Sequence, residues 1–329
     1  MLKNNKIFIF GGTGSLGYEL VHRYLDENII FIYSRDENKQ WKMKLDFSTH
    51  PKADKLRFIV GNVSDKDRVK NSLQKYVPDI IIIASAMKHI DQCELNTHES
   101  INTNLLGTKN ILDSLEEMYY ANFDNYFTVV FVSSDKACSP INNYGMCKAL
   151  SETLTIEKAH YLKQSKFVCV RYGNVLNSRG SIIPLLHEIG KDDKKPAFSL
   201  THENMTRFVM TLSQSVDLIE HAIMNASSGD VVIPELISMK VKDLVEIFSE
   251  KYNKPIKVTG LRPGEKMLES LINHTQSVRM WYDSGYYHIK SSIDYKGNLD
   301  LENERDYNSD INPLSKEQLK AYLEELNLI

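Results

Sequence analysis

The segment formed by residues 6–17 constrains the fold more than any other part of the sequence. A short apolar run at residues 7–10 leads directly into Gly11-Gly12-Thr13-Gly14-Ser15-Leu16-Gly17, and a helical pattern follows at once. Glycines at this spacing permit a tight turn, a close approach of backbone to a pyrophosphate, and packing of the helix on the sheet. The free N–H groups and the positive end of the helix favour phosphate. We therefore expect dinucleotide binding at Gly11, Thr13, Gly14, Ser15, Leu16 and Gly17.

Short apolar runs alternate with helical patterns through the first half of the chain. The runs are rich in Ile, Val and Phe, and they cover residues 7–10, 29–33, 56–60, 80–84, 127–132 and 168–171. The helical patterns between them cover residues 16–26, 66–76, 99–119 and 144–162. This alternation predicts an α/β fold, a Rossmann-like doubly wound parallel sheet with helices on both faces.

The alternation ends after about Gly173. The later part predicts helices at residues 212–224 and 242–252, a strand at 230–234, and a terminal helix at 315–326 opened by Ser315 as N-cap. Ligands of open α/β sheets bind beyond the carboxyl ends of the strands, so this part should cover that edge. We expect residues 1–173 to form the cofactor-binding domain with the catalytic residues. Residues 174–329 should form mainly a smaller α/β substrate-binding lobe, with the chain crossing between the lobes.

Composition excludes several classes of partner. A net charge of −3 provides no basic field for nucleic acid. The four cysteines form no CxxC pair, which favours buried thiols in a reducing compartment, and no His/Cys/Asp grouping has metal-ligand spacing. The apolar runs are too short to span a bilayer, and the start leaves no room for a secretory signal. We expect a cytoplasmic protein without a metal.

The end of the second strand bears on the choice of cofactor. It reads Tyr33-Ser34-Arg35-Asp36, where an NAD-preferring site usually carries an acidic residue at the strand tip. A guanidinium at this place suits a 2′-phosphate, although Asp36 one step later keeps open an ordinary exposed arginine. Ser34 and Arg35 favour NADP.

A reactive pattern follows the fifth strand. Ser133-Ser134-Asp135-Lys136-Ala137 precedes Asn143-Tyr144-Gly145-Met146-Cys147-Lys148. Tyr144 and Lys148 stand at i and i+4 and therefore share one helix face. An ammonium beside a phenol favours the phenolate, so we expect Lys148 to lower the pKa of Tyr144 and make it a base. Ser134 is placed to hydrogen-bond the reacting oxygen.

Together these features resemble the extended short-chain dehydrogenase/reductases. Within them, Asp135-Lys136 resembles the UDP-N-acetylglucosamine 4,6-dehydratases, whereas hexose 4-epimerases carry small residues there and glucose dehydratases carry Asp-Glu. The similarity extends, in order, to Tyr33-Ser-Arg-Asp-Glu37, Lys88-His89, Thr103-Asn-Leu-Leu-Gly-Thr108, Arg171-Tyr-Gly-Asn-Val175, Met205-Thr-Arg-Phe208 and Arg262-Pro-Gly-Glu-Lys266.

The resemblance implies a reaction. Oxidation of the sugar at C4 acidifies the hydrogen on C5, which Lys136 would remove if its pKa is depressed. Asp135, when protonated, would donate to the departing C6 hydroxyl. The hydride then returns to C6. Retaining members carry Met at the position of Tyr144, so this chain resembles the inverting ones, whose product is UDP-2-acetamido-2,6-dideoxy-β-L-arabino-hex-4-ulose.

Further site residues are expected at the strand ends. The cofactor set includes Asn62, Val63, Ala84, Ala86, Asn104, Tyr144 and Lys148. Asn62 stands where the family usually has Asp for the adenine amine, and its carbonyl can still accept that hydrogen bond. Ser134 replaces the commoner Thr and keeps the hydroxyl. The substrate set comprises Lys88, His89, Asn174, Arg179, Arg207, Arg262 and Glu265. For Arg207 and His89, structural roles stay equally open.

Two alternatives remain open. A UDP-hexose or hexosamine 4-epimerase or reductase would share the Tyr144 and Lys148 machinery without elimination. A non-catalytic NADP(H) sensor would need none of Ser134, Asp135, Lys136, Tyr144 or Lys148. Members of the resembled superfamily associate through helices that correspond to residues 99–119 and 144–162, so we also expect a homo-oligomer.

Overall fold

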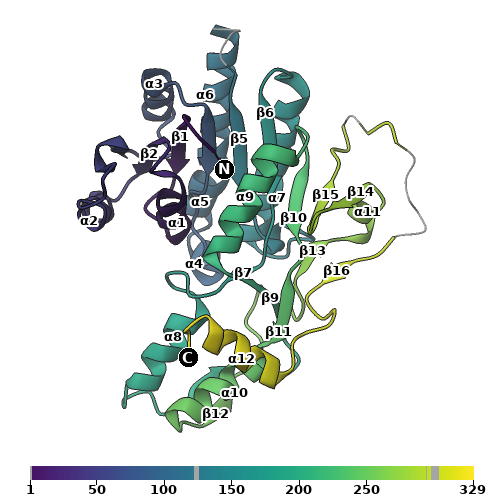
Figure 1. Ribbon diagram of the computed structural model, residues 1–329. Coiled ribbons are helices and arrows are strands. Elements are labelled where there is room, and N and C mark those ends of the chain that lie inside the picture. Colours follow the sequence, from purple (N-terminus) through teal and green to yellow (C-terminus); the bar gives the residue numbers. More distant parts are fainter. Residues whose placement is uncertain (1, 122–125, 294, 298–303) are drawn as a thin grey trace.

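A computed structural model describes residues 2–121, 126–293, 295–297 and 304–329 (Figure 1). Among them, nine strands form one sheet in the order β14-β15-β10-β6-β5-β4-β1-β2-β3. The bounds of these strands are β1 Lys6–Phe10, β2 Ile29–Ser34, β3 Leu56–Val60, β4 Ile80–Ile83, β5 Thr128–Val132, β6 Lys166–Val170, β10 Val231–Pro234, β14 Met280–Asp283 and β15 Tyr286–Ile289. The six strands of the first half pair in parallel, which confirms the Rossmann-like doubly wound sheet.

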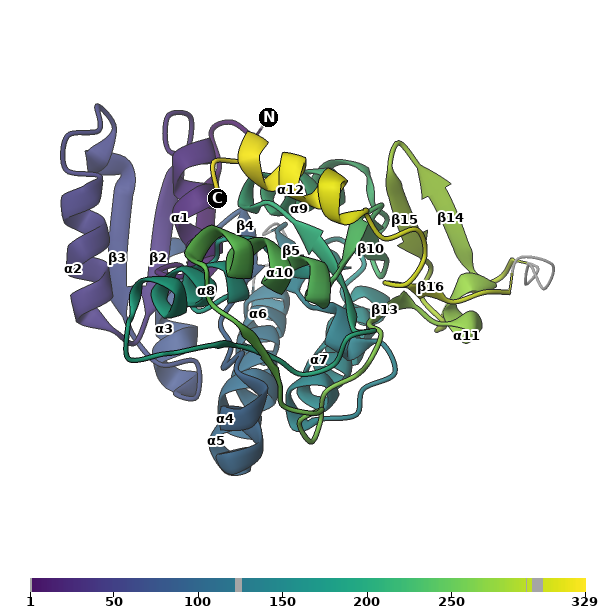
Figure 2. The ribbon, with the colours of Figure 1, turned by 90° about the horizontal axis from the view of Figure 1, so that it is seen from below.

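Helices cover both faces of this sheet because side chains alternate along the central strands. On β1, Ile7 and Ile9 join one core, and Phe8 and Phe10 join the other. The helices on the Ile7 face are α1 Ser15–Tyr24, α2 Glu37–Asp46 and α9 Leu212–Asn225. Those on the Phe8 face are α3 Lys66–Tyr76, α6 Gly107–Ala121 and α7 Asn143–Tyr161. Figure 2 shows α9 and α7 on opposite sides of the sheet.

A smaller lobe lies below the carboxyl edge of the sheet in Figure 1. Its strands are β7 Asn174–Val175, β8 Phe198–Leu200, β9 Thr206–Met210, β11 Ile237–Lys240 and β12 Ile256–Val258. Its helices, α8 Ile182–Lys191, α10 Val241–Tyr252 and α12 Lys316–Glu325, share a separate apolar core. Ser315 caps α12 by accepting a hydrogen bond from the Gln318 backbone N–H, as the sequence predicts.

The later chain also returns to the large sheet. β10 extends it in parallel after β6, and β15 and β14 then add an antiparallel edge that the sequence pattern did not reveal. The pattern at residues 99–119 is not one helix, because α5 Thr97–Ser100 passes through a π-helical turn at Ile101–Leu106 before α6 begins. The remaining short elements are α4 Ile90–Leu95, α11 His274–Ser277, β13 Ser270–Ile272 and β16 Tyr307–Asn308.

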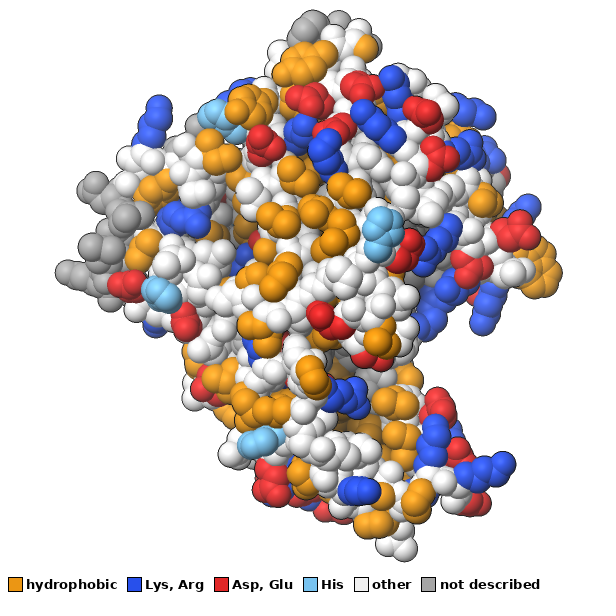
Figure 3. Space-filling model, turned by 180° about the vertical axis from the view of Figure 1, so that it is seen from behind, with side chains coloured by type: hydrophobic (Ala, Val, Ile, Leu, Met, Phe, Trp, Pro, Cys, Tyr) orange, Lys and Arg blue, Asp and Glu red, His pale blue; other side chains and the backbone are white. Residues whose placement is uncertain are grey.

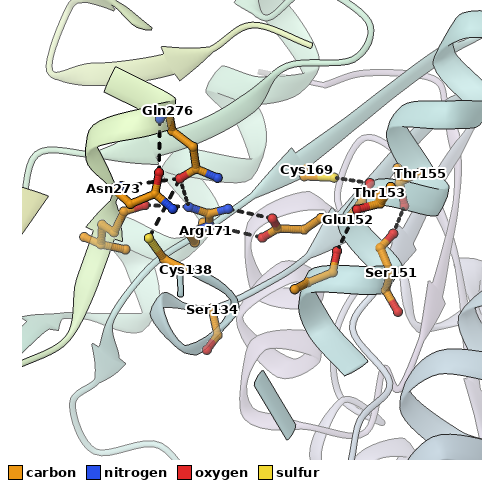
Figure 4. A network of polar contacts seen from close by, with 12 residues as sticks. Ser134, Cys138, Ser151, Glu152, Thr153, Thr155, Cys169, Arg171, Asn273 and Gln276 are labelled. Atoms are coloured by element: carbon orange, nitrogen blue, oxygen red, sulfur yellow. Dashed lines mark hydrogen bonds and ion pairs between the residues drawn. The ribbon is translucent and has the colours of Figure 1, made fainter. Parts of the chain in front are cut away.

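A buried arginine at the end of β6 ties helix α7 to the later chain (Figure 4). Arg171 is 1% exposed, and its guanidinium forms two hydrogen bonds with Glu152 of α7, at 3.1 and 2.6 Å. The same group donates to the Leu271 carbonyl at 2.7 Å and to Gln276 Oε1 at 3.0 Å. These contacts fix β13 and α11 against α7, next to the residues that follow β5.

Replacing this arginine should destabilise the whole fold. Arg171→Met leaves the Glu152 carboxylate buried without its cation, so we expect the free energy of unfolding to fall by about 3–5 kcal/mol in urea denaturation. The double variant Arg171→Met/Glu152→Met removes both charges and should lose less. A single variant that loses under about 1 kcal/mol would contradict this role.

Candidate active site

The large cavity of the protein lies at the carboxyl ends of β1 to β5, between the sheet and the smaller lobe. Its volume is about 1080 Å³. Figure 3 shows that the surface is hollowed between the larger upper part and the smaller lower part. All the site residues predicted from sequence line this cavity except Gly17, Asn104 and Arg262. The fold therefore brings together groups that lie far apart in the chain.

The glycine loop forms one wall of the cavity. Gly11 has φ +79°, and a Cβ there would lie 2.7 Å from the Ser85 Cα, so the tight turn requires glycine. Gly17 lies inside α1, where a Cβ would meet the Gly12 carbonyl oxygen at 1.9 Å. Its role is close packing of the helix, as predicted. The start of α1 borders the cavity through Gly14 and Ser15, so the positive end of the helix faces the cavity, an arrangement that favours phosphate.

Two cations border the end of the cavity at β2. Ser34 Oγ accepts a hydrogen bond from Thr13 Oγ1 at 3.0 Å, which joins the glycine loop to the second strand. Arg35 is half exposed and pairs with Glu99 at 3.5 Å. Lys39, from the first turn of α2, also lines the cavity and pairs with Asp36 at 3.1 Å. Lys39 was not predicted from sequence, because α2 itself was not predicted.

The ends of β3 and β4 complete the cofactor side. Asn62, Val63, Ala84 and Ala86 line the cavity. Asn62 Oδ1 accepts hydrogen bonds from the Ser64 backbone N–H and hydroxyl, both at 3.2 Å. Asn104 is buried outside the cavity lining, and its amide bonds the Met87 backbone N–H at 2.7 Å and carbonyl at 3.0 Å. Its contacts therefore hold the loop after β4 in place.

Tyr144 and Lys148 share one face of α7 and both line the cavity. The expected effect of Lys148 on Tyr144 is nevertheless wrong, because burial raises the pKa of the phenol to about 12. The groups that act in the opposite direction are Lys136 and a hydrogen bond with Ser134. Burial lowers the pKa of Lys148 to about 8, and its Nζ donates to the Val132 carbonyl at 2.7 Å.

Lys136 lies between two buried carboxylates. Its Nζ is 3.0 Å from Asp135 Oδ1 and 3.6 Å from Glu269 Oε1. Burial alone would lower the pKa of Lys136, but these two charges hold it well above its usual range. The prediction of a depressed pKa is therefore wrong, because the neighbours are mainly anions rather than cations. Glu269 was not predicted from sequence, because it lies 133 positions after Lys136 in the chain.

Of two predicted substrate arginines, Arg207 lines the cavity and Arg262 does not. Arg207 is buried and pairs with Glu269 at 3.9 Å, and it also donates to the Thr206 and Lys266 carbonyls at 2.7 and 3.0 Å. Arg207 therefore lines the cavity as a cation that these contacts hold in place. Arg262 is exposed outside the cavity lining, so only Glu265 of the predicted turn reaches it.

The loop after β7 crosses onto the glycine loop. The Arg179 guanidinium donates to the Thr13 carbonyl, and its backbone N–H donates to Ser15 Oγ at 3.0 Å. Lys88 Nζ in turn donates to the Arg179 carbonyl. Burial, with the nearby Arg179 charge, lowers the pKa of Lys88. His89 and Asn174 line the same region.

Several buried polar atoms of the lining have no hydrogen-bond partner among the described residues. A buried polar atom without a partner is costly, so such atoms mark where a ligand supplies the missing contact. They are Ser85 Oγ, Ser133 Oγ, Asp135 Oδ2, Ser181 Oγ and Glu269 Oε2. These residues fit a polar ligand that extends from the glycine loop to the Asp135–Lys136 pair.

The sequence matches a family described as polysaccharide biosynthesis protein over residues 7–291. The chain belongs to the polysaccharide biosynthesis protein family. It is 34% identical to a UDP-N-acetylglucosamine 4,6-dehydratase (inverting) of Campylobacter jejuni, over 90% of this chain and 85% of that protein. It is 38% identical to a UDP-glucose 4-epimerase of Rickettsia akari, over 88% and 84%. The crystal structure of Pen from Bacillus thuringiensis superposes with a TM-score of 0.88 at 31% identity, covering 99% of both chains.

These relatives of the polysaccharide biosynthesis family carry two reaction names at similar identity. Identity to these relatives therefore does not distinguish the two reactions. Two further structural findings hold for the described parts of the chain. They contain no group of three or more His, Cys, Asp or Glu side chains arranged to hold a metal ion. No helix there has the length and apolar character needed to cross a membrane.

Proposed function

We propose that this protein is an NADP-dependent UDP-N-acetylglucosamine 4,6-dehydratase of the 5-inverting type. The observation that carries the proposal is the position of Asp135 and Lys136, which line the same cavity as Tyr144 and the glycine loop. Elimination needs a second acid and base in addition to Tyr144, and an epimerase needs no such pair. The Campylobacter jejuni relative, whose name states this reaction, supports the assignment.

Tyr144 is the proposed base for the C4 hydroxyl. A nicotinamide dinucleotide held by the glycine loop would supply the hydride chemistry, with C4 as the donor and C6 as the later acceptor. Tyr144 acts as the phenolate, its own proton having passed to solvent, and takes the hydroxyl proton, while Ser134 at the tip of β5 hydrogen-bonds the same oxygen. Lys148 is held inside the protein by the Val132 carbonyl, with its Nζ 4.6 Å from the Phe131 ring centre, and lines the cavity beside Tyr144. It is proposed to bind the cofactor ribose.

Asp135 and Lys136 are proposed to carry out the elimination. The ketone at C4 acidifies the C5 hydrogen, which Lys136 removes as a neutral amine. Asp135 gives a proton to the C6 hydroxyl, which leaves as water. Asp135 Oδ2 is buried and has no protein partner among the described residues, which fits an atom that hydrogen-bonds the departing hydroxyl.

The nucleotide sugar is proposed to lie against the smaller lobe. Lys88, His89, Asn174, Arg207 and Glu265 line this part of the cavity and supply donors and charge for the diphosphate and the sugar. Arg179 contacts the glycine loop directly, so we place it where the cofactor and the nucleotide sugar meet.

A homo-oligomer is also proposed. Figure 3 shows hydrophobic side chains gathered over the middle of the face opposite α9. Exposed apolar residues lie on the π-helical turn and on α7, namely Ile101, Leu106, Met146, Leu150 and Tyr161. A second copy packed on these helices would remove this apolar surface from water.

The proposed preference for NADP rests on Ser34, Arg35 and Lys39, which surround the place for a 2′-phosphate. Arg35→Ala removes a charged donor to that phosphate, so we expect NADP affinity to fall about 10-fold or more with NAD affinity unchanged. Fluorescence titration with both cofactors measures this. Lys42→Ala, on an exposed part of α2, is the matched control. A wild-type protein that binds NAD more tightly would overturn the preference.

The reaction itself is tested by incubating the protein, NADP and UDP-N-acetylglucosamine. We expect a product lighter by one water, with the L-arabino configuration at C5 by NMR. A Lys136→Ala variant should lose about 100-fold or more of this activity. The Rickettsia akari relative makes 4-epimerisation the second candidate, and it predicts a product of unchanged mass. A D-xylo product would refute inversion but retain the dehydration.

A further inference from the structure

Glu269 enters the site from the second half of the chain, directly before β13. The residue is 2% exposed, and it lines the cavity. Its backbone is pinned to Ser309, with N–H donating to Ser309 Oγ at 3.0 Å and the carbonyl accepting from the Ser309 N–H at 2.9 Å. The carboxylate is therefore held at one place in the site.

The two oxygens of Glu269 have different surroundings. Oε1 faces Lys136 Nζ at 3.6 Å and Arg207 Nε at 3.9 Å, distances that belong to ion pairs. Oε2 is buried and has no hydrogen-bond partner among the described residues. A buried carboxylate oxygen without a donor is unfavourable when charged and becomes favourable when it carries a proton. Burial raises the pKa of Glu269, although the nearby charge of Lys136 acts in the opposite direction.

To act as a base, Lys136 needs a neighbour that can accept its proton. An ammonium has no lone pair and cannot remove a proton from C5, yet Asp135 and Glu269 together keep Lys136 charged. Of these two carboxylates, Asp135 already accepts through Oδ1 from the Ser134 hydroxyl at 3.1 Å and from Lys136 at 3.0 Å. The Glu269 oxygen that faces Lys136 forms only the longer ion pairs, so Glu269 is the better acceptor for a proton.

We propose that Glu269 takes a proton from Lys136 and so converts it into the neutral amine that removes the C5 proton. This inference rests on the proposed dehydratase function. It assigns Glu269 as a positioning and proton-holding residue that acts through Lys136, and it explains why a lysine held between anions can serve as a base.

The protons balance in this scheme. The N–H bond of Lys136 breaks and an O–H bond forms on Glu269, which turns ammonium and carboxylate into amine and carboxylic acid. The amine lone pair takes the C5 proton, and the electron pair of the C–H bond passes into the C4 ketone. Asp135, which has taken up a proton from solvent, then gives it to the C6 oxygen as the C6–O bond breaks, and water leaves. Solvent supplies the new C5 proton, and Glu269 releases its proton to solvent, so the pair ends as it began.

Glu269→Gln tests this role, because glutamine keeps the size and cannot accept the proton. On mixing the variant with NADP and UDP-N-acetylglucosamine, we expect reduction of the nicotinamide, followed by absorbance, to continue. Release of water should fall about 100-fold or more. Raising the pH should restore elimination in the variant, since Lys136 then loses its proton to solvent. Glu269→Asp keeps a carboxylate and should retain more elimination than Glu269→Gln.

Glu246→Gln serves as the control, because Glu246 pairs with Lys316 away from the cavity and should leave both steps unchanged. Full or faster elimination in Glu269→Gln would overturn the proposal, since Glu269 would then only hold Lys136 charged. Equal loss of reduction and elimination in both Glu269 variants would also overturn it and indicate a structural role. A wild-type protein that releases no water would instead refute the dehydratase function.

Discussion

The ammonium of Lys136 is held between two buried carboxylates, and the two parts of the protein meet at this contact. Asp135 follows a central strand of the parallel sheet, and Glu269 comes from the segment that leads into β13. Buried charges are stable only when paired, so this cluster requires the later chain to close against the sheet edge. The cavity acquires the Glu269 carboxylate from that closure.

The elements around this cluster also fix the positions of the residues that line the cavity. Parallel strands bring the glycine loop, the Ser134 tip and the start of α7 to one edge. Arg171 then joins α7 to β13 through buried hydrogen bonds, so Tyr144 and Glu269 are fixed relative to one another. The Arg179 loop adds a second link, because it contacts the glycine loop from the smaller lobe. The glycine loop, Tyr144 and the Lys136 cluster are thereby held in one cavity.

The glycine turn, the parallel sheet and the shared helix face of Tyr144 and Lys148 could be predicted from sequence. Each depends on residues that lie near one another in the chain. The antiparallel edge of β14 and β15 was not, since short strands after residue 173 carry no clear period. Glu269 was missed because only the tertiary fold sets it beside Lys136. The same fact explains the wrong expectation for the Lys136 pKa: a charge depends on all its spatial neighbours, and sequence supplied only Asp135.

A crystal structure of the protein with NADP and UDP-N-acetylglucosamine tests the central claim most directly. The hexose should lie with its C4 hydroxyl at Tyr144 and its C5 and C6 facing Lys136 and Asp135, with reacting atoms about 3–3.5 Å apart. A complex in which the lysine and aspartate side chains both point away from the hexose would contradict the elimination, even with the dinucleotide bound on the glycine loop.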